Sequence, residues 1–338
     1  MKRPYAVFFV LVMLFATFAL SLAACNDNTG GTTQDDTSAV QDPDDAETPS
    51  TDDPSSDDDT DTDDEATYFC YRPVQGYDYT EGDEIEHITY YSSVAGADKH
   101  ANVILPVDYD PEKSYPVLYL LHGLMSDEYS WIDGVNGLEM GANYIVQNAH
   151  YFDGAPEMIV VCVNSLVNAT ETEPEWSMLP PSAPPELAET YDLTGRDIAE
   201  CLMPYINEHY STLTGKENTA IAGYSMGGRE AMLTAFAYQD IFGWVGAFSS
   251  ASFGTDVVSA SDYVPDFTLD KGSDGFYYVQ ITVGGLDTLA PVSRNICARL
   301  DEIGVEYTYN TVFFGMHSPS VWRSALNDFV KNIFTDPA

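Results

Sequence analysis

The stretch TAIAGYSMGGREAMLTAFA, residues 219–237, decides the fold. Residues 219–224 form a short apolar run that predicts a buried strand, and residues 226–237 have the pattern of a helix. Between them, Gly223, Ser225 and Gly227 make a G-x-S-x-G motif. Glycines two residues before and after the serine remove Cβ atoms that would clash where a strained strand-to-helix turn folds back on itself. The motif therefore predicts an exposed serine hydroxyl beside the positive end of a helix, which favours a developing anion.

Outward from this stretch, apolar runs of strand length alternate with longer helical patterns. The expected strands are residues 87–91, 101–105, 116–121, 158–163, 219–224, 244–248, 277–283 and 307–314, and the expected helices are residues 138–149, 191–210, 226–237, 292–303 and 319–333. We expect the first two strands to pair antiparallel around the turn-rich residues 95–98. The alternation predicts an α/β fold with a mostly parallel central sheet and helices on both faces. Active sites of such sheets lie at the carboxyl ends of the strands.

A serine hydroxyl needs a base that removes its proton. Of six histidines, only His317 follows Ser225, in a loop between the last expected strand and the final helix. The imidazole in turn needs a carboxylate that fixes its tautomer. Asp287 follows the strand expected at 277–283 and gives the chain order Ser, Asp, His. The alternative carboxylates lie in a less regular segment and are Asp256, Asp262, Asp266, Asp270 and Asp274.

An oxyanion formed at a substrate carbonyl needs donors that are already in place. The amide that follows the serine, that of Met226, is the first candidate. The second is the amide of Leu124, because His122, Gly123 and Leu124 follow the strand expected at 116–121. We expect His122 itself to brace this loop through hydrogen bonds rather than to act as a base.

Four groups of residues carry a resemblance to a known family. They are LLHG at 120–123, SDE at 126–128 with Trp131, IAGYSMGG at 221–228, and His317 with Trp322. Over about residues 86–334, the chain resembles the feruloyl and acetyl-xylan esterases of the family-1 carbohydrate esterases, which have the α/β-hydrolase fold. It is also similar to S-formylglutathione hydrolases, enterochelin esterases and mycolyl transferases. The resemblance implies that Ser225, Asp287 and His317 take the triad positions, and that Leu124 and Met226 take the oxyanion positions.

Aromatic residues near these motifs are candidates for contact with an aromatic acyl group or a sugar ring. They are Trp131, Tyr224, Trp176 and Trp322, and packing inside the domain is the alternative role for Trp131 and Trp322. Trp176 lies in a long, polar, Pro-rich stretch that ends at residue 189, which is either a pocket wall or a surface insertion. The sequence has no paired Cys/His spacing, no H-E-x-x-H and no phosphate-binding glycine loop, so we expect no metal and no nucleotide cofactor.

The N-terminus predicts export and attachment to a membrane. Lys2 and Arg3 precede an apolar run, residues 5–20, and the small residues before Cys25 resemble a bacterial lipobox. We therefore expect residues 1–24 to be a lipoprotein signal peptide and Cys25 to be lipidated, with an uncleaved membrane anchor as the alternative. Residues 26–67 contain 16 acidic and no basic residues. Residues 25–67 are therefore expected to form a disordered, extended linker before a domain that covers residues 68–338.

Charge and cysteine content narrow the possible partners of this domain. Residues 68–338 have a formal charge of −27, so nucleic acid is not an expected partner. Cys70, Cys162, Cys201 and Cys297 permit two disulfides, but three of them lie in apolar strand or helix patterns, which favours buried free thiols.

Together these observations predict a serine esterase, expected on the resemblance to act on feruloyl or acetyl groups of plant cell-wall polysaccharide such as xylan. The alternatives are an acyltransferase, a peptidase or another esterase with the same three residues, or a surface lipoprotein that binds without catalysis. The only expected membrane contact is the N-terminal lipid.

Overall fold

The computed structural model describes residues 67–69, 85–174, 185–252 and 265–335, which belong to one compact unit, residues 66–338. The predicted signal peptide, Cys25 and nearly all of the predicted linker lie outside these residues, as do Trp176, Cys70, Asp256 and Asp262. None of the helices in the described residues has the length and apolar character needed to cross a membrane.

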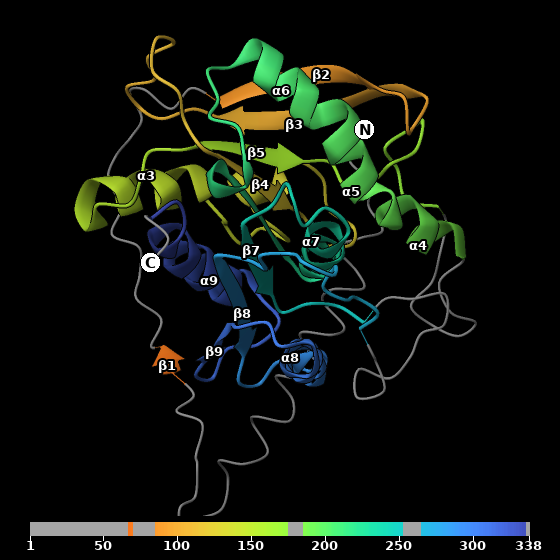
Figure 1. The fold of residues 1–338 in the computed structure, drawn as a ribbon, viewed down its shortest axis with the longest axis vertical. Helices are drawn as coiled ribbons and strands as arrows, with labels where there is room; N and C mark the ends of the chain where they lie inside the picture. The colour runs from red at the N-terminus through yellow and green to blue at the C-terminus, as the bar shows by residue number, and fades with distance from the viewer. Residues whose placement is uncertain (1–66, 70–84, 175–184, 253–264, 336–338) are drawn as a thin grey trace, which may run out of the picture. The chain divides into compact units, whose positions relative to one another are not determined.

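A nine-stranded sheet forms the centre of the described part of the chain (Figure 1). The strands are β1 (Thr67–Phe69), β2 (Ile85–Ser92), β3 (Ala97–Ile104), β4 (Val117–Leu121), β5 (Ile159–Val163), β6 (Thr219–Tyr224), β7 (Trp244–Phe248), β8 (Tyr278–Gly284) and β9 (Thr308–Val312). Their order across the sheet is β1-β9-β8-β7-β6-β4-β5-β3-β2. Only β3 runs against its neighbours β2 and β5, and the other pairs are parallel. The predicted mostly parallel sheet is therefore confirmed.

Helices cover both faces of this sheet. They are α2 (Ser130–Asp133), α3 (Ala142–Asp153), α4 (Pro185–Asp192), α5 (Thr194–Asp197), a π-helical segment (Ile198–Leu202), α6 (Met203–His209), a 3₁₀ turn (Lys216–Asn218), α7 (Met226–Ala237), α8 (Ala290–Ile303) and α9 (Pro319–Asn332). Helices α3 and α9 lie side by side and pack on one face with α2 (Figure 1). The π-helical segment, α6, α7 and α8 pack on the other face.

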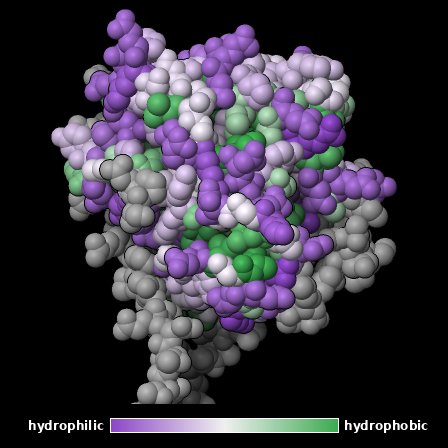
Figure 2. Space-filling view, in the orientation of Figure 1, coloured by the Kyte–Doolittle hydropathy of each residue, from purple (hydrophilic) through white to green (hydrophobic). Residues whose placement is uncertain are grey.

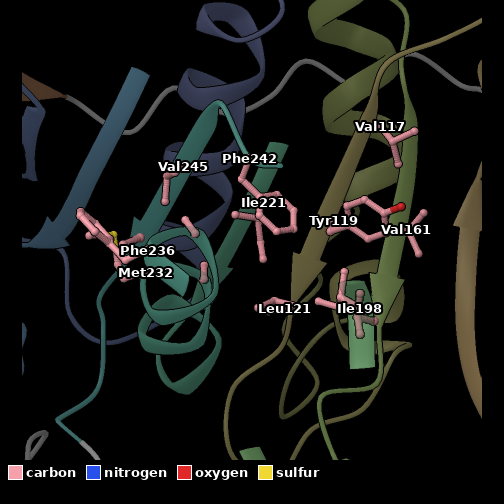
Figure 3. Packing of buried hydrophobic residues seen from close by; sticks show 14 of the residues in the cluster. Val117, Tyr119, Leu121, Val161, Ile198, Ile221, Met232, Phe236, Phe242 and Val245 are labelled. Carbon is pink, nitrogen blue, oxygen red and sulfur yellow. The ribbon is translucent and has the colours of Figure 1, made fainter. Parts of the chain in front are cut away.

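The core consists of two layers because side chains alternate along each strand. In β4, Tyr119 and Leu121 point towards the layer that contains Ile198 and Met232 (Figure 3). Leu118 and Leu120 of the same strand point into the layer beneath α3 and α9. Every residue of β4 to β7 is buried, as expected for strands that are covered on both sides. The surface in the view of Figure 2 is largely hydrophilic and has a small apolar patch near its centre.

The helix expected at 191–210 is broken into shorter pieces, which corrects that prediction. Helix α4 already begins at Pro185, a residue that suits the first turn of a helix because its missing N–H needs no partner there. Further along, Pro204 cannot donate the backbone hydrogen bond that a continuous helix requires, and the π-helical segment precedes it. Helix α3 begins at Ala142 rather than 138, because Gly141 has a left-handed backbone with φ 60°.

Three cysteines lie in the described residues, and all are free thiols. Cys162 and Cys297 are buried, as predicted, whereas Cys201 is partly exposed. Burial raises the pKa of Cys297 to about 12, so this thiol stays protonated at neutral pH.

Candidate active site

Ser225 lies at the turn between β6 and α7, with φ 54° and ψ −118°. A non-glycine residue with positive φ is strained and persists only where its surroundings hold it. Here the Ser225 N–H donates to the Phe248 carbonyl at 2.8 Å, and the Ser225 carbonyl accepts from the Ala251 N–H at 2.9 Å and from the Gly228 N–H at 3.1 Å. These bonds connect the turn to the end of β7, and the serine side chain remains partly exposed.

The two glycines of the motif are required by close backbone contacts. A Cβ at Gly223 would lie 2.3 Å from the Gly227 carbonyl oxygen, and a Cβ at Gly227 would lie 2.4 Å from the Leu121 carbonyl oxygen. Both contacts involve backbone atoms, which cannot rotate away. The turn therefore has the tight geometry that the sequence pattern predicted.

His317 and Asp287 complete a continuous chain of hydrogen bonds with the serine. His317 Nε2 lies 2.9 Å from Ser225 Oγ, and His317 Nδ1 lies 3.0 Å from Asp287 Oδ2. An ionised carboxylate only accepts, so Nδ1 carries the proton and Nε2 is free to accept from the serine hydroxyl. This geometry selects Asp287 over the alternative carboxylates in the described residues, because it is the one bonded to His317.

Backbone hydrogen bonds connect the loops that carry these two side chains. The Gly285 N–H donates to the Val312 carbonyl at 2.9 Å, and the Leu286 N–H donates to the Gly315 carbonyl at 2.8 Å. The loop after β8 is therefore attached to the loop after β9, two residues before the histidine. Because the strands are neighbours in the sheet, the carboxylate and the imidazole are held in a fixed relation.

Asp287 is held in its ionised form by hydrogen bonding. Its burial raises the pKa, but the hydrogen bond and the charge of His317, together with the hydrogen bond from the Leu289 amide, outweigh burial and hold the pKa below its ordinary value. As the pH falls, the unfolded chain therefore protonates Asp287 at a higher pH than the folded protein does, and the free energy of unfolding decreases. The stability that Asp287 contributes is therefore present above its ordinary pKa and is lost as the pH falls through the lowered value.

His122 holds the loop that follows β4. The Ser165 N–H donates to His122 Nε2 at 2.9 Å, so the ring proton is on Nδ1, which donates to the Gly123 carbonyl at 2.8 Å. Burial lowers the pKa of His122, which keeps the ring neutral. The N–H and C=O of a trans peptide point in opposite directions, so fixing the Gly123 carbonyl fixes the direction of the Leu124 N–H. His122 therefore braces the loop, as predicted.

The candidate oxyanion donors belong to the first residue of α7 and to the loop that follows β4. Met226 is the first residue of α7, and its amide is one of those that have no acceptor within the helix. Gly123 lies against the serine, because a Cβ added there would be 3.2 Å from Ser225 Cβ. Leu124 follows Gly123 directly in the same loop.

Three aromatic rings predicted to contact substrate are buried instead. Trp131 and Tyr224 are each 1% exposed and Trp322 is 4% exposed. Tyr224 stacks on Trp322, with ring centroids 4.2 Å apart, and Trp322 meets the His317 ring edge to face at 5.1 Å. The Trp131 indole N–H donates to the Leu121 carbonyl. The expectation of substrate stacking is therefore corrected: these rings support the serine and histidine from within the core, as in the packing alternative.

Exposed apolar side chains lie instead on the loops of the site. Met125, Leu286 and Met316 are 63%, 59% and 49% exposed, and each follows or precedes a candidate site residue directly. Sequence reasoning missed them, although their positions next to Leu124, Asp287 and His317 were available as a signal. No cluster of three or more His, Cys, Asp or Glu residues in the described part of the chain is placed to ligate a metal ion.

This site, at the carboxyl ends of β6, β8 and β9 in a mostly parallel sheet, has the organisation of an α/β-hydrolase. Its serine, histidine and carboxylate are arranged so that the hydroxyl can transfer its proton to the imidazole. Comparison with known proteins identifies the family. Residues 92–333 match the family described as "Putative esterase", and the chain belongs to this family.

Relatives within this group are similar over the same domain. An endo-1,4-beta-xylanase/feruloyl esterase of Xylanibacter ruminicola is 29% identical over 256 residues, which are 74% of this chain and 31% of that enzyme. The chain thus spans about a third of that relative's length. A solved ferulic acid esterase of carbohydrate esterase family 1 from Anaeromyces mucronatus, in complex with ferulic acid, is 28% identical, with a TM-score of 0.63 and coverage of 78% of this chain and 94% of that one.

The fold extends to more distant hydrolases. S-formylglutathione hydrolase from Staphylococcus aureus has a TM-score of 0.52 at 19% identity, with coverage of 75% of this chain and 98% of that one. The family and its relatives identify the domain as a carboxylic ester hydrolase similar to the family-1 carbohydrate esterases, which confirms the resemblance.

Proposed function

We propose that this domain hydrolyses feruloyl or related acyl esters of plant cell-wall polysaccharide, with Ser225 as nucleophile, His317 as general base and Asp287 as the residue that orients the base. The observation that carries the proposal is the chain of hydrogen bonds Ser225 Oγ to His317 Nε2 and His317 Nδ1 to Asp287. The likeness to a structure with bound ferulic acid and to a xylanase/feruloyl esterase supports this acyl group and a xylan substrate.

In the first step, Ser225 Oγ attacks the ester carbonyl while His317 Nε2 takes the hydroxyl proton. The oxygen–carbon bond to the serine forms, and the carbonyl oxygen becomes an anion. When the tetrahedral intermediate collapses, the bond between the acyl carbon and the sugar oxygen breaks, and His317 gives its proton to that oxygen, which leaves as a hydroxyl. Asp287 stays ionised, holds the tautomer and stabilises the imidazolium that forms between these two transfers.

The anion is stabilised by the amides of Leu124 and Met226. Met226 begins α7, so its N–H also carries the positive end of the helix dipole. In the second step, His317 removes a proton from water, which attacks the acyl-enzyme and releases the acid. The serine then regains its proton from the imidazolium.

The apolar side chains on the site loops are our candidates for contact with the acyl group. Met125, Leu286 and Met316 are exposed and adjacent in sequence to the reacting residues. An aromatic acid such as ferulate gains stability where its ring leaves water for an apolar surface. The buried rings of Trp131, Tyr224 and Trp322 then hold the site from below.

We also propose that the enzyme is displayed outside the cell on a lipid anchor. The basic start, the apolar run and the small residues before Cys25 support export and lipidation, and the acidic residues 26–67 support an extended spacer. A tethered domain suits a substrate that is too large to enter the cell. Metabolic labelling with a fatty acid, compared between the full chain and Cys25→Ala, tests this part of the proposal.

The test of the activity uses the purified domain with methyl ferulate and p-nitrophenyl acetate. We expect Ser225→Ala to lose at least about 1000-fold in kcat, because the remaining groups cannot form an acyl-enzyme. Asp266→Asn is the matched control, since Asp266 is an exposed carboxylate that the sequence offered as an alternative. Comparable turnover by the Ser225 variant and the wild type would refute the mechanism, and activity on acetate alone would refute the preference for ferulate.

A further inference from the structure

Glu173 reaches the candidate oxyanion loop, residues 122–125, from a distant part of the chain. Its Oε1 accepts the Met125 N–H at 2.6 Å and the Tyr191 hydroxyl at 2.7 Å. We propose that Glu173 is a positioning residue, which holds this loop so that the Leu124 amide points at the substrate oxyanion. The inference rests on the proposed function, in which Leu124 is an oxyanion donor.

The carboxylate fixes a strained part of the loop. Met125 has a left-handed backbone with φ 60°, a conformation that strains a non-glycine residue. The Met125 N–H belongs to the peptide that follows Leu124, whereas His122 holds the carbonyl of the peptide that precedes Leu124. The two peptides on either side of the Leu124 Cα are thus each held by one side chain, so neither can rotate without breaking a hydrogen bond.

Tyr191 gives the carboxylate a buried partner. Its side chain is fully buried in α4, within a cluster that contains Met226 and Leu187. Glu173 therefore connects the loop that carries the Leu124 amide to the helix that packs against the residue carrying the second amide. One oxygen atom thus accepts from both the loop and the helix, which links the two directly.

The segment that carries Glu173 is itself anchored. Lys99 is completely buried in β3, and its Nζ donates to the carbonyls of Asn164 and Leu166 at 2.9 Å each. The same Nζ contacts Glu171 Oε1 at 3.3 Å. These contacts attach the segment after β5 to the sheet as far as Glu171, two residues before Glu173.

The test measures kcat and KM on p-nitrophenyl acetate for a series at position 173. We expect Glu173→Ala to lower kcat about 10- to 100-fold with KM nearly unchanged, because a misdirected donor weakens the transition state rather than substrate binding. Glu173→Gln keeps an oxygen acceptor at the same reach and should restore most of the activity. Glu173→Asp keeps the charge but is one methylene too short, so it should resemble the alanine variant.

Two further measurements separate positioning from a general structural effect. An arylboronic acid forms a tetrahedral adduct with the serine and should lose affinity in Glu173→Ala in proportion to kcat, whereas the affinity for ferulate, a planar product, should not change. Glu189→Ala removes an exposed carboxylate from α4, the helix that carries Tyr191. This variant should match the wild type in kcat and in affinity for the boronic acid. If Glu173→Ala fails to fold, the kcat values of Glu173→Gln and Glu173→Asp test the proposal instead.

The inference is overturned if Glu173→Ala keeps wild-type kcat, if only KM rises, or if the aspartate variant is active and the glutamine variant is not. Inactive Ser225→Ala together with fully active position-173 variants would remove this inference and leave the proposed function intact. Cleavage of p-nitrophenyl acetate but not of methyl ferulate would instead refute the proposed preference for ferulate. The role of Glu173 would still be tested by kcat and KM of the position-173 variants on p-nitrophenyl acetate.

Discussion

Substituting Gly227 by alanine tests whether the close approach of α7 to the end of β4 builds the active site. The new Cβ would lie 2.4 Å from the Leu121 carbonyl oxygen and 2.6 Å from that of His122. Ordinary contacts of this kind begin near 3.4 Å. The helix start and the oxyanion loop must therefore separate by about 1 Å, because neither backbone oxygen can rotate away.

A displacement of this size should be felt mainly in catalysis. Moving a reacting group by about 1 Å can cost on the order of 100-fold in rate, and overpacking a core costs about 1 to 3 kcal/mol. We therefore expect Gly227→Ala to fold with a lowered Tm and to lose about 100-fold in kcat on p-nitrophenyl acetate, with little change in KM. Thermal unfolding and steady-state kinetics on the same preparation measure both effects.

Gly285→Ala is the matched control for this substitution. Gly285 lies two residues before Asp287, but a Cβ there meets its nearest atom, Thr311 Cγ2, at an ordinary 3.4 Å. This variant should keep near wild-type kcat and gain up to about 1 kcal/mol of stability from the lower entropy of its unfolded chain. Wild-type turnover in Gly227→Ala, or equal losses in both variants, would refute the argument from backbone contact.

Two other predictions concern buried carboxylates. Asp287→Asn should lower kcat about 1000- to 10000-fold on p-nitrophenyl acetate, because the amide no longer selects the tautomer that lets His317 Nε2 accept a proton; a loss of less than about 10-fold would contradict this role. Burial raises the pKa of Glu230 to about 7, although the adjacent Arg229 acts to lower it. Between about pH 4.5 and 7 the folded protein therefore keeps a proton on Glu230 that the unfolded chain has released. The stability that this proton contributes is lost as the pH rises through the range from about 4.5 to 7. Glu230→Gln should therefore raise the free energy of unfolding at pH 8 by on the order of 3 kcal/mol at most, and Tm with it, but should raise neither at pH 4.5. An equal rise in Tm at both pH values would contradict this prediction.

Much of the fold follows from patterns within short stretches of the sequence. Residues 219–224, 226–237 and 244–248 form the predicted strand, helix and strand with the predicted bounds, because strong periodicity and glycine punctuation coincide there. Elsewhere tertiary contacts determine whether and where an element forms. Strand β1 has only three residues and exists through its pairing with β9, which no local pattern can indicate.

The site was predictable where the chemistry demands one residue type after a particular strand. Ser225, Asp287 and His317 meet because the strands that precede them are close in a parallel sheet. The exposure of the aromatic side chains could not be predicted in this way, because a tryptophan beside a motif can equally well line a pocket or fill the core. Trp322 fills the core. Glu173 was missed because it reaches the oxyanion loop across 48 positions of sequence, with no motif of its own.

We propose that the imidazole at position 317 activates the hydroxyl at position 225. A fluorophosphonate probe reacts with such a serine, and digestion followed by mass spectrometry locates the adduct. We expect the wild-type domain to carry the probe on Ser225, Ser225→Ala to carry none, and His317→Ala to react far more slowly. A probe attached to any other residue, or equal labelling of the wild type and the His317 variant, would contradict the account.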